Sequence, residues 1–573
     1  MLSKAKFIAA LVCILSLSAG SALAATPLTR YFPDLPLAVI EAKDLQESIK
    51  QTGAFGEETQ TFLGVLFNEA LESEFGSDLG LPTALKDAAV RTLVASIRDV
   101  AGAAYSVGNS VEYLLVVRFT PKNLVVNALS KAFNGSLADY PAGQRLREGN
   151  YLATVDGGFA GGLGNNILYV SSNKDLLRGY MKRLNGQTLP TLNSGAAYRS
   201  VLASTGEGFF KVMANFSALA QVFSRSGDLT PRQAAVLRTL NLVGSAAQIV
   251  DTGMETRSVA QLNPTGGDTG LLKLLTYVPE SLELLSELPS TAPSASVVGI
   301  DTEGWLEYAQ SWFGEAGLSA TERKEGMEIV AKLKTRLGNE WGVVTTNTTD
   351  NNALASAFGF VGGSSISSAL GLAGIQDQNT VYYAKTQDGA LVLNDLETAL
   401  TGVLNEGGDP PSDAEPSDFT TPTLERTEIG GFEALMLSST RNDGQGNVVQ
   451  ENFVIANRND TIVIGSNIEA MDGYLTAAPL IENEFFKALS IPANVTGVQF
   501  IAPLRLTRQE INSSITELLK TLGASKDVPA SLQKAYGDWY ESYASRTEAS
   551  YGYSSVDGNK LIGYGKSGFL WNK

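Results

Sequence analysis

Two Asp-Thr-Gly triplets are the residues of this sequence with the clearest potential for chemistry. They stand at Asp251–Gly253 and Asp268–Gly270. The same triplet carries the catalytic carboxylates of aspartic peptidases, in which two carboxyl groups share a proton and serve as base and acid. Those enzymes place each Asp on its own lobe, far apart in sequence, whereas 17 positions separate the two here. Because Asp-Thr-Gly is also a common turn sequence, we predict two turns and no catalytic pair.

A second motif joins Ser171 to Lys174 in the Ser-x-x-Lys spacing of hydrolases that use Ser as nucleophile and Lys as base. The partner motifs of that chemistry, Ser-Asp-Asn and Lys-Thr-Gly, do not follow it. Ser and Asn are also the residues that most often begin a helix. We therefore predict that the segment around Ser171 is a helix cap.

Three further motifs each lack a required position. Gly565-Lys566-Ser567 resembles the end of a phosphate loop, but Lys560 stands where the leading Gly is needed, and the segment reads as a C-terminal strand. Gly157–Gly164 lacks the third Gly of a dinucleotide fingerprint and fits a hairpin connection. Asn442–Asn447 offers oxygen ligands for Ca²⁺ without the Gly and Glu of an EF-hand. We assign no catalytic, cofactor-binding or metal-binding residue and expect no cofactor.

The composition removes whole classes of function. The 573 residues include 43 Lys and Arg against 60 Asp and Glu, a net charge of −17, which argues against nucleic acid and anionic membrane surfaces as partners. There is no His, and Cys13 is the single Cys. Ser-His-Asp triads, Cys-His pairs and the usual zinc and copper sites are therefore excluded. The sequence predicts a protein that is not an enzyme.

The first 24 residues have the pattern of a signal peptide. Lys4 and Lys6 precede an apolar run, and Ala22-Leu23-Ala24 supplies the small residues that a signal peptidase requires, with cleavage before Ala25. Cleavage removes Cys13, and no later stretch is long and apolar enough for a transmembrane helix. We expect an exported protein of the periplasm, the cell envelope or the extracellular space.

The remaining chain has the pattern of a tandem duplication with an offset of 294 residues. Asn165–Asn173 matches Asn459–Asn467, and Tyr180 matches Tyr474. Each copy reads as a polar turn, a short apolar strand, a Ser-Asn helix cap and an amphipathic helix. More loosely, Pro36–Ile40 parallels Pro293–Ile300 as the first strand of each copy.

The looser match also predicts the surrounding elements. We expect hairpins that pair 101–106 with 111–119 and 341–346 with 353–361, helices over 231–243 and 531–544, and a core-facing aromatic stripe on a helix over 303–313. Tyr536, Trp539, Tyr540 and Tyr543 share one helical face, which favours core packing over an interface or a sugar-stacking surface.

We therefore predict an α+β fold made of two modules, each a mainly antiparallel sheet with helices packed on one face. The predicted divisions are a signal peptide at 1–24, module 1 at 25–276, a linker at 277–292 and module 2 at 293–573. An acidic, Pro-rich loop at 404–423 forms a surface excursion within module 2.

The order of strand, Ser-Asn cap, helix ending in Gly-Tyr, aromatic-led helix and strand stands at 165–214 and 459–502. It resembles a family of exported bacterial proteins classed as a domain of unknown function, in which a segment like Tyr31–Pro36 precedes the first strand. The resemblance implies an envelope or extracellular setting and repeated α+β modules, and it brings no catalytic residue, cofactor or substrate.

The leading functional hypothesis is a non-enzymatic structural or interaction component of the bacterial cell envelope. One alternative is a carrier that holds an apolar ligand, a lipid or a pigment, between helices and sheet. Another is a hydrolase that uses only carboxylates, for example on glycans. The partners that fit these hypotheses are an envelope protein, a glycan or an apolar small molecule.

Overall fold

The computed structural model describes most of the chain after the predicted signal peptide. The described residues are 27–44, 96–108, 110–121, 123–136, 140–156, 159–227, 229–250, 253–313, 320–345, 380–405, 422–442, 448–466, 468–487, 491–492, 494–503 and 530–569, with a few isolated positions such as Phe62 and Arg508.

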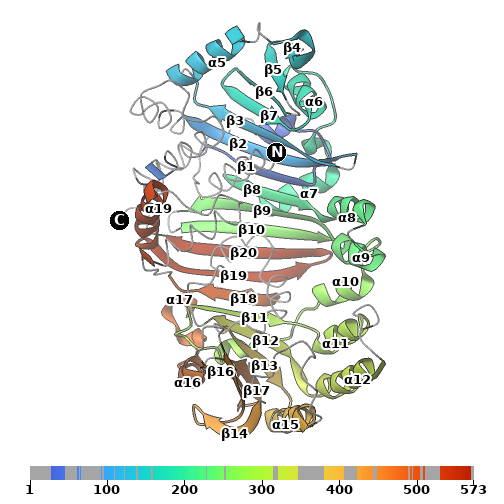
Figure 1. Cartoon of the computed structure of the whole chain (residues 1–573), viewed down its shortest axis with the longest axis vertical. Coiled ribbons are helices and arrows are strands. Elements are labelled where there is room, and N and C mark those ends of the chain that lie inside the picture. The colour runs from blue at the N-terminus through green and yellow to red at the C-terminus, as the bar shows by residue number, and fades with distance from the viewer. Residues whose placement is uncertain are drawn as a thin grey trace.

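The described strands form one antiparallel sheet of 20 strands (Figure 1). Their bounds are β1 Ala38–Ala42, β2 Ile97–Val107, β3 Ser110–Phe119, β4 Arg145–Glu148, β5 Tyr151–Asp156, β6 Phe159–Gly164, β7 Ile167–Ser171, β8 Phe210–Asn215, β9 Leu240–Val250, β10 Gly253–Leu262, β11 Ser294–Gly299, β12 Leu337–Thr345, β13 Thr380–Thr386, β14 Thr423–Ile429, β15 Phe432–Asn442, β16 Val448–Arg458, β17 Thr461–Gly465, β18 Val495–Ile501, β19 Thr547–Asp557 and β20 Lys560–Phe569.

The strand order is the same when read from either end of the sheet to its centre. From one end it runs β4-β5-β6-β7-β3-β2-β1-β8-β9-β10, and from the other it runs β14-β15-β16-β17-β13-β12-β11-β18-β19-β20. The two series meet where β10 pairs with β20, and there Arg257 lies directly opposite Tyr564. We call β1–β10 the first half and β11–β20 the second half.

The helices flank this sheet in both halves (Figure 1). Their bounds are η1 Leu28–Tyr31, α5 Leu124–Ser136, η4 Ala142–Gln144, α6 Lys174–Leu184, η5 Leu192–Ser194, α7 Ala196–Thr205, α8 Phe216–Ser226, α9 Pro231–Thr239, α10 Thr269–Leu275, η6 Glu283–Ser286, α11 Thr302–Gln310, α12 Ala320–Lys334, α15 Gly389–Asn405, α16 Ile468–Thr476, η8 Leu480–Glu482, α17 Glu484–Lys487 and α19 Ala530–Ala544.

Helical residues contact both faces of the sheet in the second half, whereas the sequence predicted helices on one face. Val463 of β17 shares a core with Met471 of α16, while its neighbour Ile462 packs with Leu393 of α15. Successive residues of a strand point to opposite faces. The strand therefore buries both faces and lies between two layers of helix.

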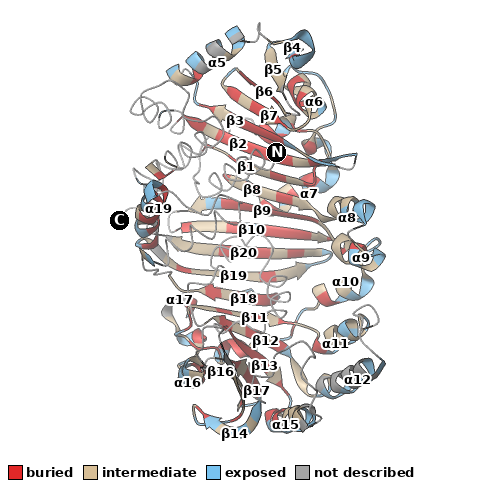
Figure 2. Ribbon diagram, viewed as in Figure 1, coloured by how far each residue is buried: buried red, intermediate tan, exposed pale blue. Residues whose placement is uncertain are grey.

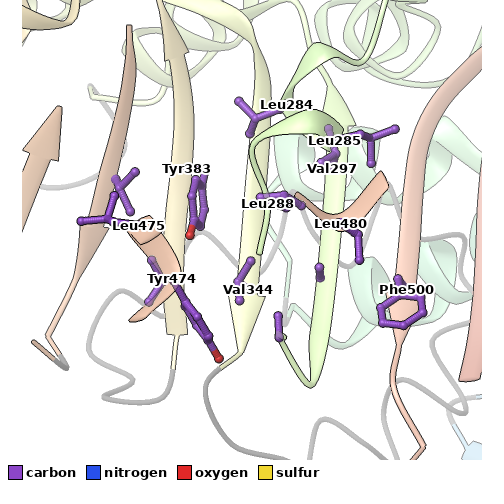
Figure 3. Packing of buried hydrophobic residues seen from close by; sticks show 14 of the residues in the cluster. Leu284, Leu285, Leu288, Val297, Val344, Tyr383, Tyr474, Leu475, Leu480 and Phe500 are labelled. Atoms are coloured by element: carbon purple, nitrogen blue, oxygen red, sulfur yellow. The ribbon is translucent and has the colours of Figure 1, made fainter. Parts of the chain in front are cut away.

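The segment predicted as a linker at 277–292 contributes to this core. Leu284 of η6 and Leu288 are fully buried, and they pack with Val344 and Tyr383 of the second half (Figure 3). Burying a Leu side chain contributes about 2 kcal/mol. The residues just before β11 are therefore part of the second half's packing.

The repeated polar turns are confirmed as tight hairpin turns. Asn165 and Asn166, between β6 and β7, have φ values of 52° and 59°, and Asn459 and Asp460, between β16 and β17, have φ values of 49° and 62°. Positive φ at both central residues is the geometry that suits the twist of a two-residue hairpin, and Asn and Asp tolerate it best.

Other predicted elements differ from the structure. Residues 353–361 lie outside the described part, and the predicted pairing with 341–346 is wrong because β11 and β13 occupy both sides of β12. The helix predicted over 231–243 ends at Thr239, where β9 begins with Leu240. Trp305 of α11 and Trp312, just after the end of that helix, are half-buried, so the predicted aromatic stripe does not face a closed core.

Candidate functional site

The structure gives Asp268 of the second Asp-Thr-Gly triplet a helix-capping role. Its Oδ1 accepts a hydrogen bond from the Leu271 N–H at 3.0 Å, at the beginning of α10, and its Oδ2 accepts one from the Tyr308 hydroxyl at 3.2 Å. Asp251 lies outside the described residues, although Val250 and Gly253 on either side of that turn are paired across β9 and β10. Both oxygens of Asp268 are thus engaged in holding α10 and α11.

Ser171 and Lys174 also serve the local fold. The buried Ser171 hydroxyl donates to the Tyr113 carbonyl at 2.6 Å and accepts from the Asn173 N–H at 3.1 Å. Asn173 caps α6 by accepting from the Asp175 and Leu176 N–H groups. Lys174 is exposed at the first turn of that helix. The predicted helix cap is confirmed, and its capping residue is Asn173.

The remaining motifs occupy structural positions where they are described. Lys566 lies within β20, as the sequence predicts for a strand. The Gly-rich segment lies around the β5–β6 hairpin, in which Gly162 has no room for a side chain because a Cβ would stand 2.0 Å from the Leu152 carbonyl oxygen. Residues 443–447 lie outside the described part. Within the described residues, no group of three or more acidic side chains is arranged to hold a metal ion.

The aromatic face of α19 is packed, as the sequence predicts. Tyr536, Trp539 and Tyr540 are each less than a tenth exposed, and Trp539 stacks on Phe62 with ring centroids 5.5 Å apart. The Tyr543 side chain lies outside the described part. The three described residues of this face therefore belong to the interior.

A buried carboxylate pair that sequence reasoning missed stands at the end of β1. Asp99 Oδ1 accepts the Asp44 N–H at 2.8 Å, and its Oδ2 accepts from Arg118 at 2.8 Å, while Arg98 donates to Asp44 at 3.0 Å. Burial raises the pKa of Asp99 although the hydrogen bond from Asp44 and the Arg118 charge oppose the shift. Each carboxylate is fixed by an arginine, which is a structural arrangement.

A second charged cluster lies beneath α7. Glu41 accepts hydrogen bonds from the N–H of Thr29 at 3.2 Å and from its hydroxyl at 3.0 Å, and Lys211 lines the same cavity of about 10 Å³. Such a volume holds about one water molecule. In the second half Val297 and Val498 occupy the matching places in β11 and β18. The fold at this position therefore does not depend on buried charge.

The most distinctive surface lies at the centre of the sheet, where the two halves meet. Six side chains of β10, β20 and β19 form two cross-strand rows, which we call the central grid. One row is Arg257, Tyr564 and Tyr553, and the other is Glu255, Lys566 and Tyr551. Residues directly opposite one another in a register share a face of the sheet.

The two faces at this position have opposite character. Arg257 is exposed and the other five grid residues are half-buried, and β19 and β20 are largely intermediate in exposure (Figure 2). The alternating positions are the small, buried residues Thr256, Gly565 and Gly552 in one row and Ser258, Gly563 and Ser554 in the next. All large polar and aromatic side chains are therefore directed to the grid face.

The grid combines stacked rings with charge. The Tyr553 and Tyr564 rings are stacked at a centroid distance of 5.2 Å. Burial, followed by hydrogen bonding to the Glu255 carboxylate and its charge, raises the pKa of Tyr564, and burial and Glu255 also raise the pKa of Tyr551. Both phenols are therefore neutral hydrogen-bond donors at pH 7. The charges of the grid come from Arg257, Lys566 and Glu255.

The sequence shows which strand positions carry the grid side chains but not which of these positions lie opposite one another. In β19 and β20, tyrosines and charged residues alternate with Gly and Ser, the period of a strand with two unlike faces. Which of these positions meet depends on the register between β10 and β20, whose residues are about 300 positions apart in the chain. No local pattern determines that register.

Comparison with known proteins gives little further guidance. No family model matches the chain, and no curated protein matches it. Solved structures of TP0453 are among the structural matches, at low similarity. Crystal form III is 9% identical, covers 45% of this chain and 90% of that chain, and has a TM-score of 0.25, while crystal form I is 10% identical, covers 45% and 89%, and has a TM-score of 0.25. A similarity at this level supports no inference about function.

Proposed function

We propose that the protein is an exported, non-enzymatic interaction component of the bacterial cell envelope and that the central grid is its binding surface. The observation that carries this proposal is the grid itself, an exposed Arg beside stacked Tyr rings in the middle of a rigid sheet. Tyr and Arg are the residue types that most often dominate binding energy at interfaces. A sheet with strands on both sides holds these side chains in fixed positions.

The proposal that the protein is exported rests on its sequence. Residues 1–24 lie outside the described part and carry the signal-peptide pattern, and the chain resembles an exported family. In the described part, none of the helices is long and apolar enough to cross a membrane. Export to the periplasm, the envelope surface or the medium is the proposal that follows from the signal-peptide pattern.

We also propose that the two halves arose by tandem duplication. The identical strand order on either side of β10 and β20 supports this origin, as do the hairpin turns at Asn165 and Asn459, which are 294 residues apart. The 3₁₀ helices η1 and η6 stand before the first strand of each half. Two copies related in this way place the grid at the junction between them.

The alternative functions have less support in the described residues. The cavity beneath α7 has room for about one water molecule and is too small for a lipid or a pigment. Asp44 and Asp99 are close, but their oxygens are engaged by Arg98, Arg118 and a backbone N–H. The central grid, in contrast, supports a binding role.

The test is co-sedimentation of the purified mature protein with isolated bacterial envelopes. We expect the wild type to sediment and a variant with Arg257→Gln and Tyr564→Leu to remain in solution. A matched variant, Arg225→Gln in α8, changes an exposed arginine away from the grid and should sediment like the wild type. Equal sedimentation of the grid variant and the wild type would contradict the proposal.

A further inference from the structure

We infer that the central grid binds an acidic polysaccharide, with sugar rings on the tyrosine pair and sugar carboxylates on Arg257 and Lys566. This inference rests on the proposed function and names the chemical class of its partner. It draws on three features of the grid: its cations, its stacked aromatic rings and its place in the sheet.

The first feature is charge. Within the described structure, Arg257 and Lys566 form no ion pair, although Glu255 lies directly opposite Lys566 across β10 and β20 and beside the Tyr564 hydroxyl. The grid therefore carries two cations against one carboxylate. The net negative charge of the protein opposes an anionic ligand only at a distance, because physiological salt screens exposed charges beyond about 8 Å. At contact, Arg257 can bind a carboxylate through two parallel hydrogen bonds.

The second feature is the stacked aromatic rings. The Tyr553 and Tyr564 rings are stacked with centroids 5.2 Å apart and planes inclined by 30°, so they form one half-buried apolar cluster beside Arg257. Neighbouring strands are about 4.8 Å apart, so one row of the grid spans about 10 Å. That span suits two linked sugar rings. The neutral Tyr551 hydroxyl supplies a donor and an acceptor for sugar hydroxyls, and the Tyr564 hydroxyl, which donates to Glu255, supplies an acceptor.

The third feature separates a glycan from an acidic peptide. Peptides bind sheets mainly by adding a strand at a free edge, where backbone groups are unpaired. The grid lies at the centre, where β10 pairs with β9 and β20, and β20 pairs with β10 and β19. Its backbone is therefore occupied, and a ligand can use only side chains on a flat face. A chain of sugar rings with pendant carboxylates meets that condition better than an extended peptide.

The experiment measures binding of the mature protein to polygalacturonate by calorimetry, with fully methyl-esterified polygalacturonate as the matched neutral polymer. We expect binding to polygalacturonate that weakens with added salt, and at least about tenfold weaker binding to the ester, since a charge-assisted hydrogen bond contributes about that factor. Arg257→Gln, Lys566→Gln and Tyr564→Leu should each weaken binding by a similar factor. The control variants Arg225→Gln and Lys174→Gln should bind like the wild type.

Other outcomes overturn the inference in distinguishable ways. Equal binding of both polymers would exclude recognition of the carboxylates, and tighter, grid-dependent binding of polyglutamate would assign the grid to an acidic peptide. If polygalacturonate does not bind while the Arg257→Gln and Tyr564→Leu variant still fails to sediment with envelopes, the glycan inference fails and the proposed binding function stands. Arg257→Lys, which keeps the positive charge, should retain more binding than Arg257→Gln, and unchanged melting would show that each variant is folded.

Discussion

Tyr383 lies directly opposite Val463 across β13 and β17, and Tyr169 lies directly opposite Val116 across β7 and β3. The two pairs occupy the same place in their halves with the tyrosine and the valine exchanged between the strands. Tyr383 and Tyr169 are both fully buried. Cores tolerate changes that conserve total volume. The exchange preserves the total volume of the cross-strand pair, although the residue at each of its two positions differs between the halves.

The exchange leaves the two hydroxyls in different situations. The Tyr169 hydroxyl donates to the Leu152 carbonyl at 2.8 Å, whereas the Tyr383 hydroxyl is buried without a hydrogen-bond partner in the described structure. We expect Tyr169→Phe to lower the free energy of unfolding by about 1 kcal/mol and Tyr383→Phe to leave it unchanged or raise it. Urea unfolding of the two variants side by side is the measurement. Equal losses in both would show that the Tyr383 hydroxyl is satisfied in solution.

The capping role of Asp268 predicts a difference between two substitutions. Asp268→Asn keeps an oxygen that can accept from the Leu271 N–H, whereas Asp268→Ala loses the cap of α10. We expect Ala to lower the free energy of unfolding by about 1 kcal/mol and Asn to have a smaller effect. An assay of the purified wild type at acid pH accompanies the melting curves. Pepstatin-sensitive proteolysis that either substitution abolishes would instead make Asp268 catalytic.

The buried Asp99 predicts a pH dependence of stability. Burial raises its pKa in the folded protein above the ordinary value of 3.8, so the folded state binds the proton more tightly than the unfolded state. The stabilisation from this group is fully present below that ordinary value and is lost as the pH rises through the folded pKa. We expect the stability of the wild type relative to Asp99→Asn to fall over that window. If denaturant titrations show that the stability difference between the wild type and Asp99→Asn rises with pH, folding lowers the pKa of Asp99 and the prediction is wrong.

Sequence periodicity and turn chemistry were sufficient for the parts of the fold that are local. The Asn165 turn, the β7 strand and the cap of α6 follow one another within ten residues, and each depends on its own neighbours. The partner of β12 was not predictable in the same way. Its partner β13 begins 35 residues after β12 ends, and an apolar run at 353–361 fits the pattern of a strand equally well.

The candidate site was less predictable than the fold because its residues are ordinary in type. Asp268 and Ser171 attracted attention as members of motifs, and the structure uses both for helix caps. Arg257 and Tyr564 belong to no motif. Their importance arises from the pairing of β10 with β20, which brings residues from the ends of the two halves side by side.

That pairing leads to the last prediction, which concerns separate halves of the chain. We expect fragments 25–276 and 277–573 each to unfold cooperatively. A fragment that begins at Ser290 should melt at a lower temperature than 277–573, because it loses the buried Leu284 and Leu288. Disordered fragments, or identical melting of the two forms of the second half, would contradict this division of the core.

The two fragments should also recognise each other. Separation leaves β10 and β20 as free edges, and nine residue pairs join them in the intact sheet. The same twofold arrangement with two copies of 25–276 would place Arg257 opposite Arg257, and like charges directly opposite each other destabilise a strand pair. The mixed pair places Arg257 opposite Tyr564. The face of an aromatic ring attracts a cation, so this pairing is more stable than Arg257 opposite Arg257. Sedimentation of the mixture should therefore show a 1:1 complex, and Arg257→Glu in the first fragment should weaken it. Fragments that remain apart, or that prefer to self-associate, would show that β10 and β20 pair only because the chain connects them.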